Sequence, residues 1–168
     1  MANVHEQFDP TLQYFVYRCP YGLVTIQATN SAITRIAFGE LELSGPRKPN
    51  ALTNAAANQL MEYFAGKRHV FTLPLAPAGT PFQKRVWEEI ATIPYGYSLS
   101  ISEIAAHMGE ETSYRVVGAA AKKSPLAIVI PTHRIGPAAG RKLNATKANQ
   151  FNAALLKEEQ RHLEQPSQ

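Results

Sequence analysis

Short runs of apolar side chains dominate the first part of the chain and predict three strands. Residues 12–18 are aromatic and β-branched, and 23–27 and 33–38 are likewise rich in apolar and β-branched side chains. Turn-forming Pro, Gly, Asn and Ser residues separate the three segments. The pattern is typical of a small antiparallel meander, followed by a loop over 39–50.

A four-residue spacing of apolar side chains begins after residue 50 and predicts a helix. Ala56, Leu60 and Phe64 recur at this interval, and Gly66 follows where a helix commonly ends. The sequence Ala-Pro-Ala-Gly at 76–79 then has the composition of a linker.

The linker predicts a boundary between two domains. We expect an N-terminal α/β domain over residues 1–78 and a C-terminal helical domain over residues 79–168.

Two capping boxes mark helix starts in the second half of the chain. One spans Thr80–Gln83 with a proline at the first helical position, and the other spans Ser100–Glu103. A further helix begins near Ser113, so two short helices over about 101–123 have the spacing of a helix-turn-helix. Helical hairpins are common in α-rich domains, so this pattern alone is a weak signal of DNA binding.

The most distinctive stretch is a polar trio that follows an apolar run. The run 126–130 stops at Pro131, and Thr132, His133 and Arg134 come next. Proline restricts its own φ and favours an extended residue before it, so we expect the trio to emerge from the core at a sharp corner. Such corners often hold functional sites, although a threonine is a poor nucleophile unless a neighbouring group activates it.

Composition narrows the classes of function. The 168 residues carry a formal net charge of +4, which is a mild preference for polyanionic partners. The single cysteine, Cys19, excludes an internal disulfide and a multi-cysteine metal site, and we expect neither a metal nor a cofactor. No apolar run is long enough for a membrane span, and the N-terminus lacks the features of a signal peptide. We therefore expect a cytoplasmic protein that does not associate with membranes.

Several blocks of the chain resemble the O6-alkylguanine-DNA alkyltransferases, also called methylated-DNA–protein-cysteine methyltransferases. The blocks follow one another in the order and spacing of that family: 60–68, 79–83, 86–87, 93–96, 115–120 and 131–134. The resemblance implies an α+β fold, with a small N-terminal antiparallel-sheet domain of the ribonuclease-H-like type. It also implies a C-terminal helical DNA-binding domain whose helix-turn-helix enters the minor groove.

The resemblance also implies roles for individual residues. In the family, a cysteine in the sequence Pro-Cys-His-Arg takes the alkyl group from a flipped guanine and is not regenerated. His133 and Glu159 match the histidine and glutamate that draw off the thiol proton, and Arg134 matches the motif arginine. Arg115 matches the arginine that fills the gap left by the flipped base.

The departures from the family pattern are as informative as the matches. Thr132 stands at the acceptor cysteine, Ile101 at the tyrosine that helps to rotate the nucleotide, and Ser124 at an asparagine under the site. The glycine-tyrosine loop that lines the guanine pocket is replaced by a segment that begins with Asn144 and Ala145. Because these positions changed together, we interpret them as natural divergence.

Thr132 cannot replace a thiol in this reaction. A thiol has a pKa near 8.5 and is ionised when its pKa is lowered, whereas an alcohol needs a positioned base during attack. We therefore expect no useful alkyltransferase activity.

The expected DNA-binding surface combines the recognition helix and nearby cations. Gly118 and Ala119 permit close approach to DNA, and the bulky ring of Tyr114 replaces a small residue, where it would either clash in the minor groove or stack on sugar and base. Basic side chains are candidates for phosphate contacts: Lys122, Lys123, Arg134, Arg141, Lys142 and Lys147.

The leading hypothesis is a monomeric homologue that binds double-stranded DNA in the minor groove without methyl transfer. It would act in DNA repair by binding DNA or alkylated guanine, at the nucleoid of a prokaryote or in the nucleus of a eukaryote. One alternative is a decayed paralogue that serves as an interaction module. Another is a hydrolase that uses Thr132, His133 and Glu159, against which stands the absence of an oxyanion-hole motif.

Overall fold

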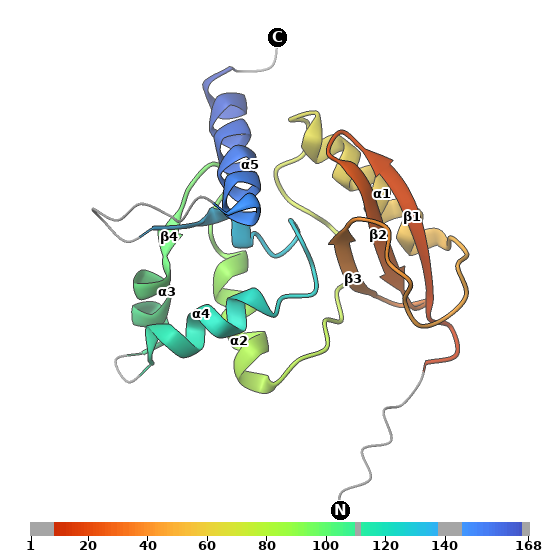
Figure 1. Ribbon diagram of the computed structural model, residues 1–168, viewed down its shortest axis with the longest axis horizontal. Helices are drawn as coiled ribbons and strands as arrows, with labels where there is room; N and C mark the ends of the chain where they lie inside the picture. The colour runs from red at the N-terminus through yellow and green to blue at the C-terminus, as the bar shows by residue number, and fades with distance from the viewer. Residues whose placement is uncertain (1–8, 110–111, 138–145, 166–168) are drawn as a thin grey trace, which may run out of the picture. The chain divides into compact units, whose positions relative to one another are not determined.

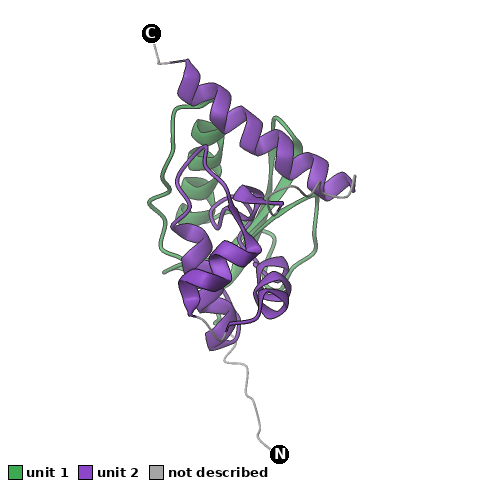
Figure 2. Cartoon of the chain, turned by 90° about the vertical axis from the view of Figure 1, so that its left-hand side faces the viewer, with its two compact units in different colours: residues 1–76 green, residues 77–168 purple. Residues whose placement is uncertain are grey.

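The computed structural model describes residues 9–109, 112–137 and 146–165. It consists of two compact units, Met1–Ala76 and Pro77–Gln168, which are distinguished by colour in Figure 2. Unit 1 contains a sheet and one helix, whereas unit 2 is mainly helical. The α+β fold class expected from the sequence is confirmed.

Unit 1 is built on a three-stranded antiparallel sheet in the order β1-β2-β3. The strands are β1 (Gln13–Cys19), β2 (Gly22–Ala28) and β3 (Ile33–Phe38), close to the three segments predicted from the sequence. The helix α1 (Ala51–Phe64) packs against this sheet (Figure 1). The central strand β2 is buried along most of its length, including its polar side chains Thr25 and Gln27.

The other side of β2 is covered by the loop that follows β3. Thr25 Oγ1 donates a hydrogen bond to the Gly39 carbonyl at 2.7 Å, and Gln27 Nε2 donates to the Ser44 carbonyl at 3.0 Å. These bonds satisfy polar side chains that would otherwise be buried without partners. The predicted loop over 39–50 therefore acts as a cover for the sheet.

The helix α1 begins with a capping box that the sequence reading missed. The Asn50 side chain accepts a hydrogen bond from the Thr53 N–H, and Thr53 Oγ1, at the third helical position, accepts one from the Asn50 N–H. Gly66 has a φ of 74° just after the helix, as expected of a helix-ending glycine. The buried face uses Tyr63 rather than Phe64, so the predicted four-residue spacing was wrong at its last position.

Unit 2 contains four α-helices among its described residues. They are α2 (Pro81–Ala91), α3 (Ile101–Met108), α4 (Tyr114–Lys122) and α5 (Lys147–Glu164). Two short parallel strands, β4 (Leu99–Ser100) and β5 (Ile135–Gly136), pair beside them, and the single 3₁₀ turn η1 (Thr132–Arg134) precedes β5 (Figure 1). Both predicted capping boxes, at Thr80 and Ser100, are present.

Trp87 fixes α2 against α4 in the core of unit 2. Its indole nitrogen donates a hydrogen bond to the Ala120 carbonyl at 2.9 Å. The backbone of Gly79 lies against the indole ring, where a Cβ would approach Trp87 to 2.5 Å. The ring is 2% exposed, so this one side chain connects the linker, α2 and α4.

Candidate DNA-binding face and base pocket

The helices α3 and α4 form the hairpin that the sequence predicted. Val117, Ala120 and Ala121 face the core of the unit, with Ala120 and Ala121 three and four residues after Val117. The opposite face of α4 is exposed and carries the predicted DNA-binding side chains: Arg115, Ala119, Lys122 and Lys123. The exposed part of this short helix is therefore cationic, and it also includes the apolar side chains of Tyr114 and Val116.

Tyr114 and Arg115 interact with each other at the start of α4. The Tyr114 ring is 56% exposed, and the Arg115 guanidinium carbon lies 6.0 Å from its centroid. The Arg115 Nε also lies 3.5 Å from the Tyr114 hydroxyl. The ring and the guanidinium thus form a cation–π contact at the exposed end of the helix.

The segment before the polar trio contains two tight reversals instead of an extended strand. The first is centred on Ile128, whose φ of 68° is rare for a β-branched residue. The second is centred on Pro131, where the Thr132 N–H donates to the Ile130 carbonyl at 2.8 Å. The predicted sharp corner is present, but it is made by two turns.

The corner sends two of its three polar side chains inward. His133 and Arg134 are 3% and 6% exposed, whereas Thr132 is half-buried. The expectation that the whole trio emerges from the core was therefore wrong. The reason is a carboxylate inside the unit that pairs with both inward side chains.

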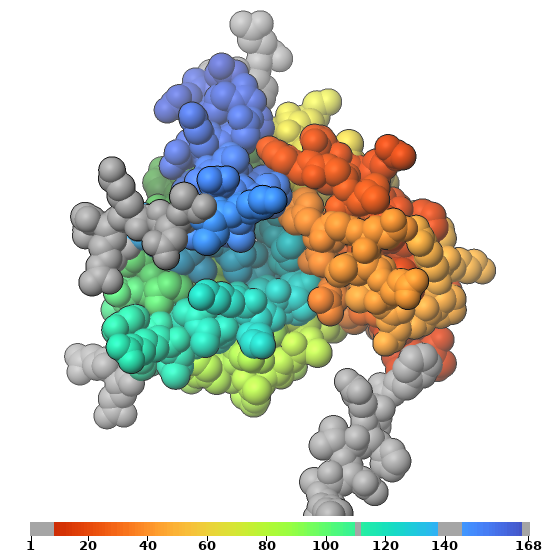
Figure 3. Space-filling model, in the orientation of Figure 1, coloured from red at the N-terminus to blue at the C-terminus, as the bar shows by residue number. Residues whose placement is uncertain are grey.

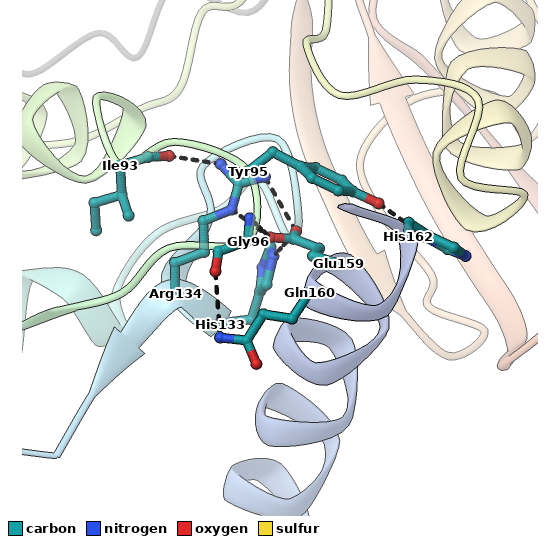
Figure 4. Close-up of polar contacts among 8 residues, drawn as sticks. All are labelled: Ile93, Tyr95, Gly96, His133, Arg134, Glu159, Gln160 and His162. Atoms are coloured by element: carbon teal, nitrogen blue, oxygen red, sulfur yellow. Dashed lines mark hydrogen bonds and ion pairs between the residues drawn. The ribbon is translucent and has the colours of Figure 1, made fainter. Parts of the chain in front are cut away.

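That carboxylate belongs to Glu159 on α5, and it accepts four hydrogen bonds or ion pairs (Figure 4). His133 Nε2 lies 2.6 Å from Oε2, and Arg134 contacts both oxygens, through Nε at 2.8 Å and Nη2 at 3.0 Å. The Gly96 N–H donates to Oε1 at 2.9 Å. Arg134 Nη1 also donates to the Ile93 carbonyl at 2.7 Å.

This arrangement corrects one predicted role. Arg134 was expected to contact DNA phosphates, but its guanidinium is buried and bound to the Glu159 carboxylate and to a backbone carbonyl. A bidentate arginine–carboxylate pair of this kind is strong and geometrically specific. Arg134 is therefore an internal anchor of the corner, and the phosphate role is withdrawn.

Tyr95 extends the same network toward His162. The Tyr95 hydroxyl and His162 Nδ1 lie 2.9 Å apart, and the Arg134 guanidinium lies 5.6 Å from the Tyr95 ring centroid (Figure 4). Burial, and to a smaller extent the negative charge of Glu159, raises the pKa of Tyr95 to about 12. The hydroxyl therefore stays protonated throughout the neutral range.

A pocket of about 390 Å³ opens beside the remaining member of the trio, Thr132. The pocket also gathers four other residues singled out from the sequence: Ile101, Gly118, Lys122 and Ser124. In the space-filling view it corresponds to a hollow between the cyan α4 and the blue α5 (Figure 3). The structure thus brings together residues that are separated by up to 31 positions in the sequence, from Ile101 to Thr132.

The sequence reading missed part of the pocket lining. Asn149 and Asn152, both on α5, line it together with Ala121, Ala127, Ile135 and Gly136. Their spacing of three residues puts them on a common face of the helix, and this is the one signal that could have identified them. Asn144 and Ala145, which were predicted to line the pocket, lie outside the described residues.

Comparison with known proteins identifies the family. The profile of the 6-O-methylguanine DNA methyltransferase DNA-binding domain matches residues 81–161, and that of the ribonuclease-like domain matches residues 12–77. Together these matches cover most of the chain. The chain belongs to this family.

Individual alkyltransferases are similar over most of their length. The methylated-DNA–protein-cysteine methyltransferase of Methanosarcina barkeri is 33% identical over 90% of this chain and 99% of its own. The constitutive enzyme of Bacillus subtilis is 50% identical over 73% of this chain and 79% of its own.

Solved structures agree with this assignment. The Mycobacterium tuberculosis O6-methylguanine methyltransferase superimposes with a TM-score of 0.80 at 32% identity, over 94% of this chain and 96% of its own. The OGT of that bacterium in complex with DNA superimposes with the same TM-score over 89% of this chain and 94% of its own.

The single cysteine of this alkyltransferase homologue is not a residue of the pocket. This residue, Cys19, ends β1 in unit 1. The pocket instead presents the Thr132 hydroxyl. The described residues contain no group of three or more metal-ligating side chains, and none of the described helices is long and apolar enough to cross a membrane.

Proposed function

We propose that this alkyltransferase homologue binds double-stranded DNA through α3 and α4 and does not transfer alkyl groups. One observation carries the proposal. The anchor of the corner, formed by Glu159, His133 and Arg134, is complete, while the residue that it holds beside the pocket is Thr132. The scaffold of the site is retained and the acceptor differs.

The cationic face of α4 supports DNA binding. Arg115, Lys122 and Lys123 are exposed on one helix and can approach phosphates, which supply most of the affinity of a sequence-independent complex. A structurally similar relative has been solved in complex with DNA. Insertion of Arg115 into the minor groove, and entry of an alkylated guanine into the pocket, are part of the proposal.

The chemistry of the acceptor supports the loss of transfer. Transfer would break the bond between the alkyl carbon and O6 of guanine and form a bond from that carbon to the acceptor, whose proton must leave. The His133–Glu159 pair is present, with Arg134 bound to the same carboxylate, so the difference from the family reaction lies in the acceptor itself. A secondary alcohol with a high pKa is then a far weaker acceptor than a thiolate.

Fluorescence anisotropy tests the part of the proposal that concerns DNA binding. We expect both an undamaged duplex and its twin with one O6-methylguanine to bind at low salt, with affinity falling as salt rises. Arg115→Ala should weaken binding, and the control Lys157→Ala should do so less, because Lys157 is an exposed cation on α5 away from the hairpin. If neither duplex binds at low salt, the interaction-module alternative is favoured over this proposal.

The hydrolase alternative has a separate test. His133 and Glu159 are paired at 2.6 Å, which is the one geometric feature that it requires and that the structure contains. Hydrolysis of a p-nitrophenyl ester that disappears in Thr132→Ala would support it. We expect no such turnover.

A further inference from the structure

Two asparagines are among the polar residues that line the pocket. Asn149 and Asn152 lie on the first two turns of α5, three residues apart, and both line the pocket. Other parts of the lining are apolar or small, among them Ile101, Gly118 and Ala121. A flat aromatic ring in this pocket would therefore meet small and apolar groups on some sides and carboxamides on another.

We propose that the carboxamides of Asn149 and Asn152 recognise the edge of an O6-alkylated guanine that carries N1 and the 2-amino group. This inference rests on the proposed function for delivery of the base from a duplex. The recognition itself is a property of the pocket and is open to a separate test.

The donor and acceptor order of the base is the basis of the proposal. Alkylation at O6 removes the proton from N1, so N1 becomes an acceptor beside the 2-amino donor. A carboxamide presents one donor and one acceptor at a matching spacing, as asparagine does when it binds adenine with two hydrogen bonds. A carboxylate in the same place would only accept, and its lone pairs would oppose that of N1.

No other described side chain of the pocket has a donor group and a separate acceptor group side by side. The hydroxyls of Ser124 and Thr132 rotate and can donate or accept, and the Lys122 ammonium only donates. The two carboxamides are the groups with both functions in a fixed arrangement. They are therefore the side chains whose replacement changes base preference in a predictable direction.

A comparison with unmodified guanine predicts in which direction the base preference should change. A carboxamide can also pair with O6 and N1–H of guanine, so the wild-type pocket should accept both bases with similar affinity. A carboxylate instead matches two adjacent donors, N1–H and the 2-amino group, which only the unmodified base offers. Replacing a carboxamide by a carboxylate should therefore select guanine against its alkylated form.

The test uses free nucleosides, so that it does not depend on DNA binding. The full chain is titrated with O6-methyl-2′-deoxyguanosine and with 2′-deoxyguanosine, and the amide resonances of Thr132 and Gly136 are followed by NMR. We expect wild-type affinities within about threefold of each other, and at least one of Asn149→Asp and Asn152→Asp should favour 2′-deoxyguanosine by about tenfold. The control Gln150→Glu adds the same charge at an exposed position of α5 that does not line the pocket, and should behave as wild type.

Two results would overturn the inference. One is the absence of any shift at the pocket resonances with either nucleoside at millimolar concentration. The other is an unchanged preference in both aspartate variants. Asn149 lies in the first helical turn, where a carboxylate is favourable, so at least that variant is expected to fold. Binding of nucleosides without binding of any duplex would refute the proposed function and leave this inference standing.

Discussion

Glu159 determines the shape of the site at the scale of single residues. Glu159 is 1% exposed, and its carboxylate holds His133 and Arg134, which come from a turn 26 and 25 positions earlier in the chain. Two buried ions cost a large desolvation energy, and only good geometry offsets it. The four contacts of this carboxylate supply that geometry, so the orientation of the corner depends on one side chain.

Glu159→Gln should destabilise unit 2 strongly. The substitution keeps the size of the side chain but leaves the Arg134 guanidinium buried without a counter-ion, and breaking a buried pair costs about 3–5 kcal/mol. The free energy of unfolding is measured by urea titration with the fluorescence of the single tryptophan, Trp87, which lies in unit 2.

The neighbouring Glu158 provides the control. It pairs with Arg161 at 2.6 Å, but both side chains are about half exposed, so Glu158→Gln should cost less than about 1 kcal/mol. Equal losses in the two variants would contradict the role assigned to Glu159.

The raised pKa of Tyr95 predicts that the stability of the fold changes at alkaline pH. The folded pKa is raised from 10.0 to about 12, so between these values the unfolded chain loses the proton while the folded chain keeps it. Stability contributed by the neutral hydroxyl is then present below pH 10 and declines as pH rises toward 12. The variant Tyr95→Phe has no hydroxyl to ionise, so its stability should not show this decline.

The measurement is the melting temperature of wild type and Tyr95→Phe at about pH 9 and about pH 11.5. We expect the wild type to lose more between these two conditions than the variant. The other six tyrosines are present in both proteins, so their ionisation cancels in the comparison. A decline of the same size in both proteins would show that the Tyr95 pKa is not raised.

At the scale of elements, one face of α4 packs in the core of unit 2, and the opposite face is exposed and belongs to the proposed DNA-binding surface. Val117, Ala120 and Ala121 bury one face of this helix, and Trp87 holds it through the Ala120 carbonyl. Ala119 lies on the exposed face and makes no contribution to that packing. Substitutions at Ala119 should therefore change binding without changing the fold.

Ala119→Glu should weaken DNA binding by at least about tenfold, because a carboxylate on the cationic face opposes the phosphates. Its effect on the free energy of unfolding should stay within about 0.5 kcal/mol, as for most exposed positions. Ala154→Glu, at an exposed position of α5, is the matched control and should retain affinity. Anisotropy at low salt measures both variants, and equal affinities for the two would contradict the assignment of this face.

The elements were largely predictable because their signals are local. The capping box from Thr80 to Gln83 and the apolar run of β2 each lie within a few residues, and the helix start and the strand are both present as predicted. The capping box at Asn50 was missed because Thr53 replaces the usual Glu or Gln at its third helical position. The end of α1 was found from Gly66 because a positive φ favours glycine.

The site was less predictable because its contacts are distant in sequence. Arginine is usually exposed, and nothing near Arg134 shows that Glu159 will meet it after 25 positions. Asn149 and Asn152 likewise resemble the solvated face of a helix until the pocket brings α5 beside Thr132. The matching of His133 with Glu159 came from family resemblance, and the 2.6 Å contact is in agreement with it.

At the scale of the whole molecule, the chain retains both parts of the family fold. The family profiles match 12–77 and 81–161, one in each unit. The Trp87 contact, the Glu159 anchor and the capping boxes are all present. The proposed loss of transfer therefore comes from the chemistry at Thr132 and not from a loss of the fold.

The most direct test is the intact mass of the protein after incubation with a duplex that contains one O6-methylguanine. The wild type should keep its mass, whereas Thr132→Cys, which restores a thiol beside the His133–Glu159 pair, should gain the mass of one methyl group in at least part of the sample. Wild-type protein that gains a methyl group on Thr132 would contradict the account.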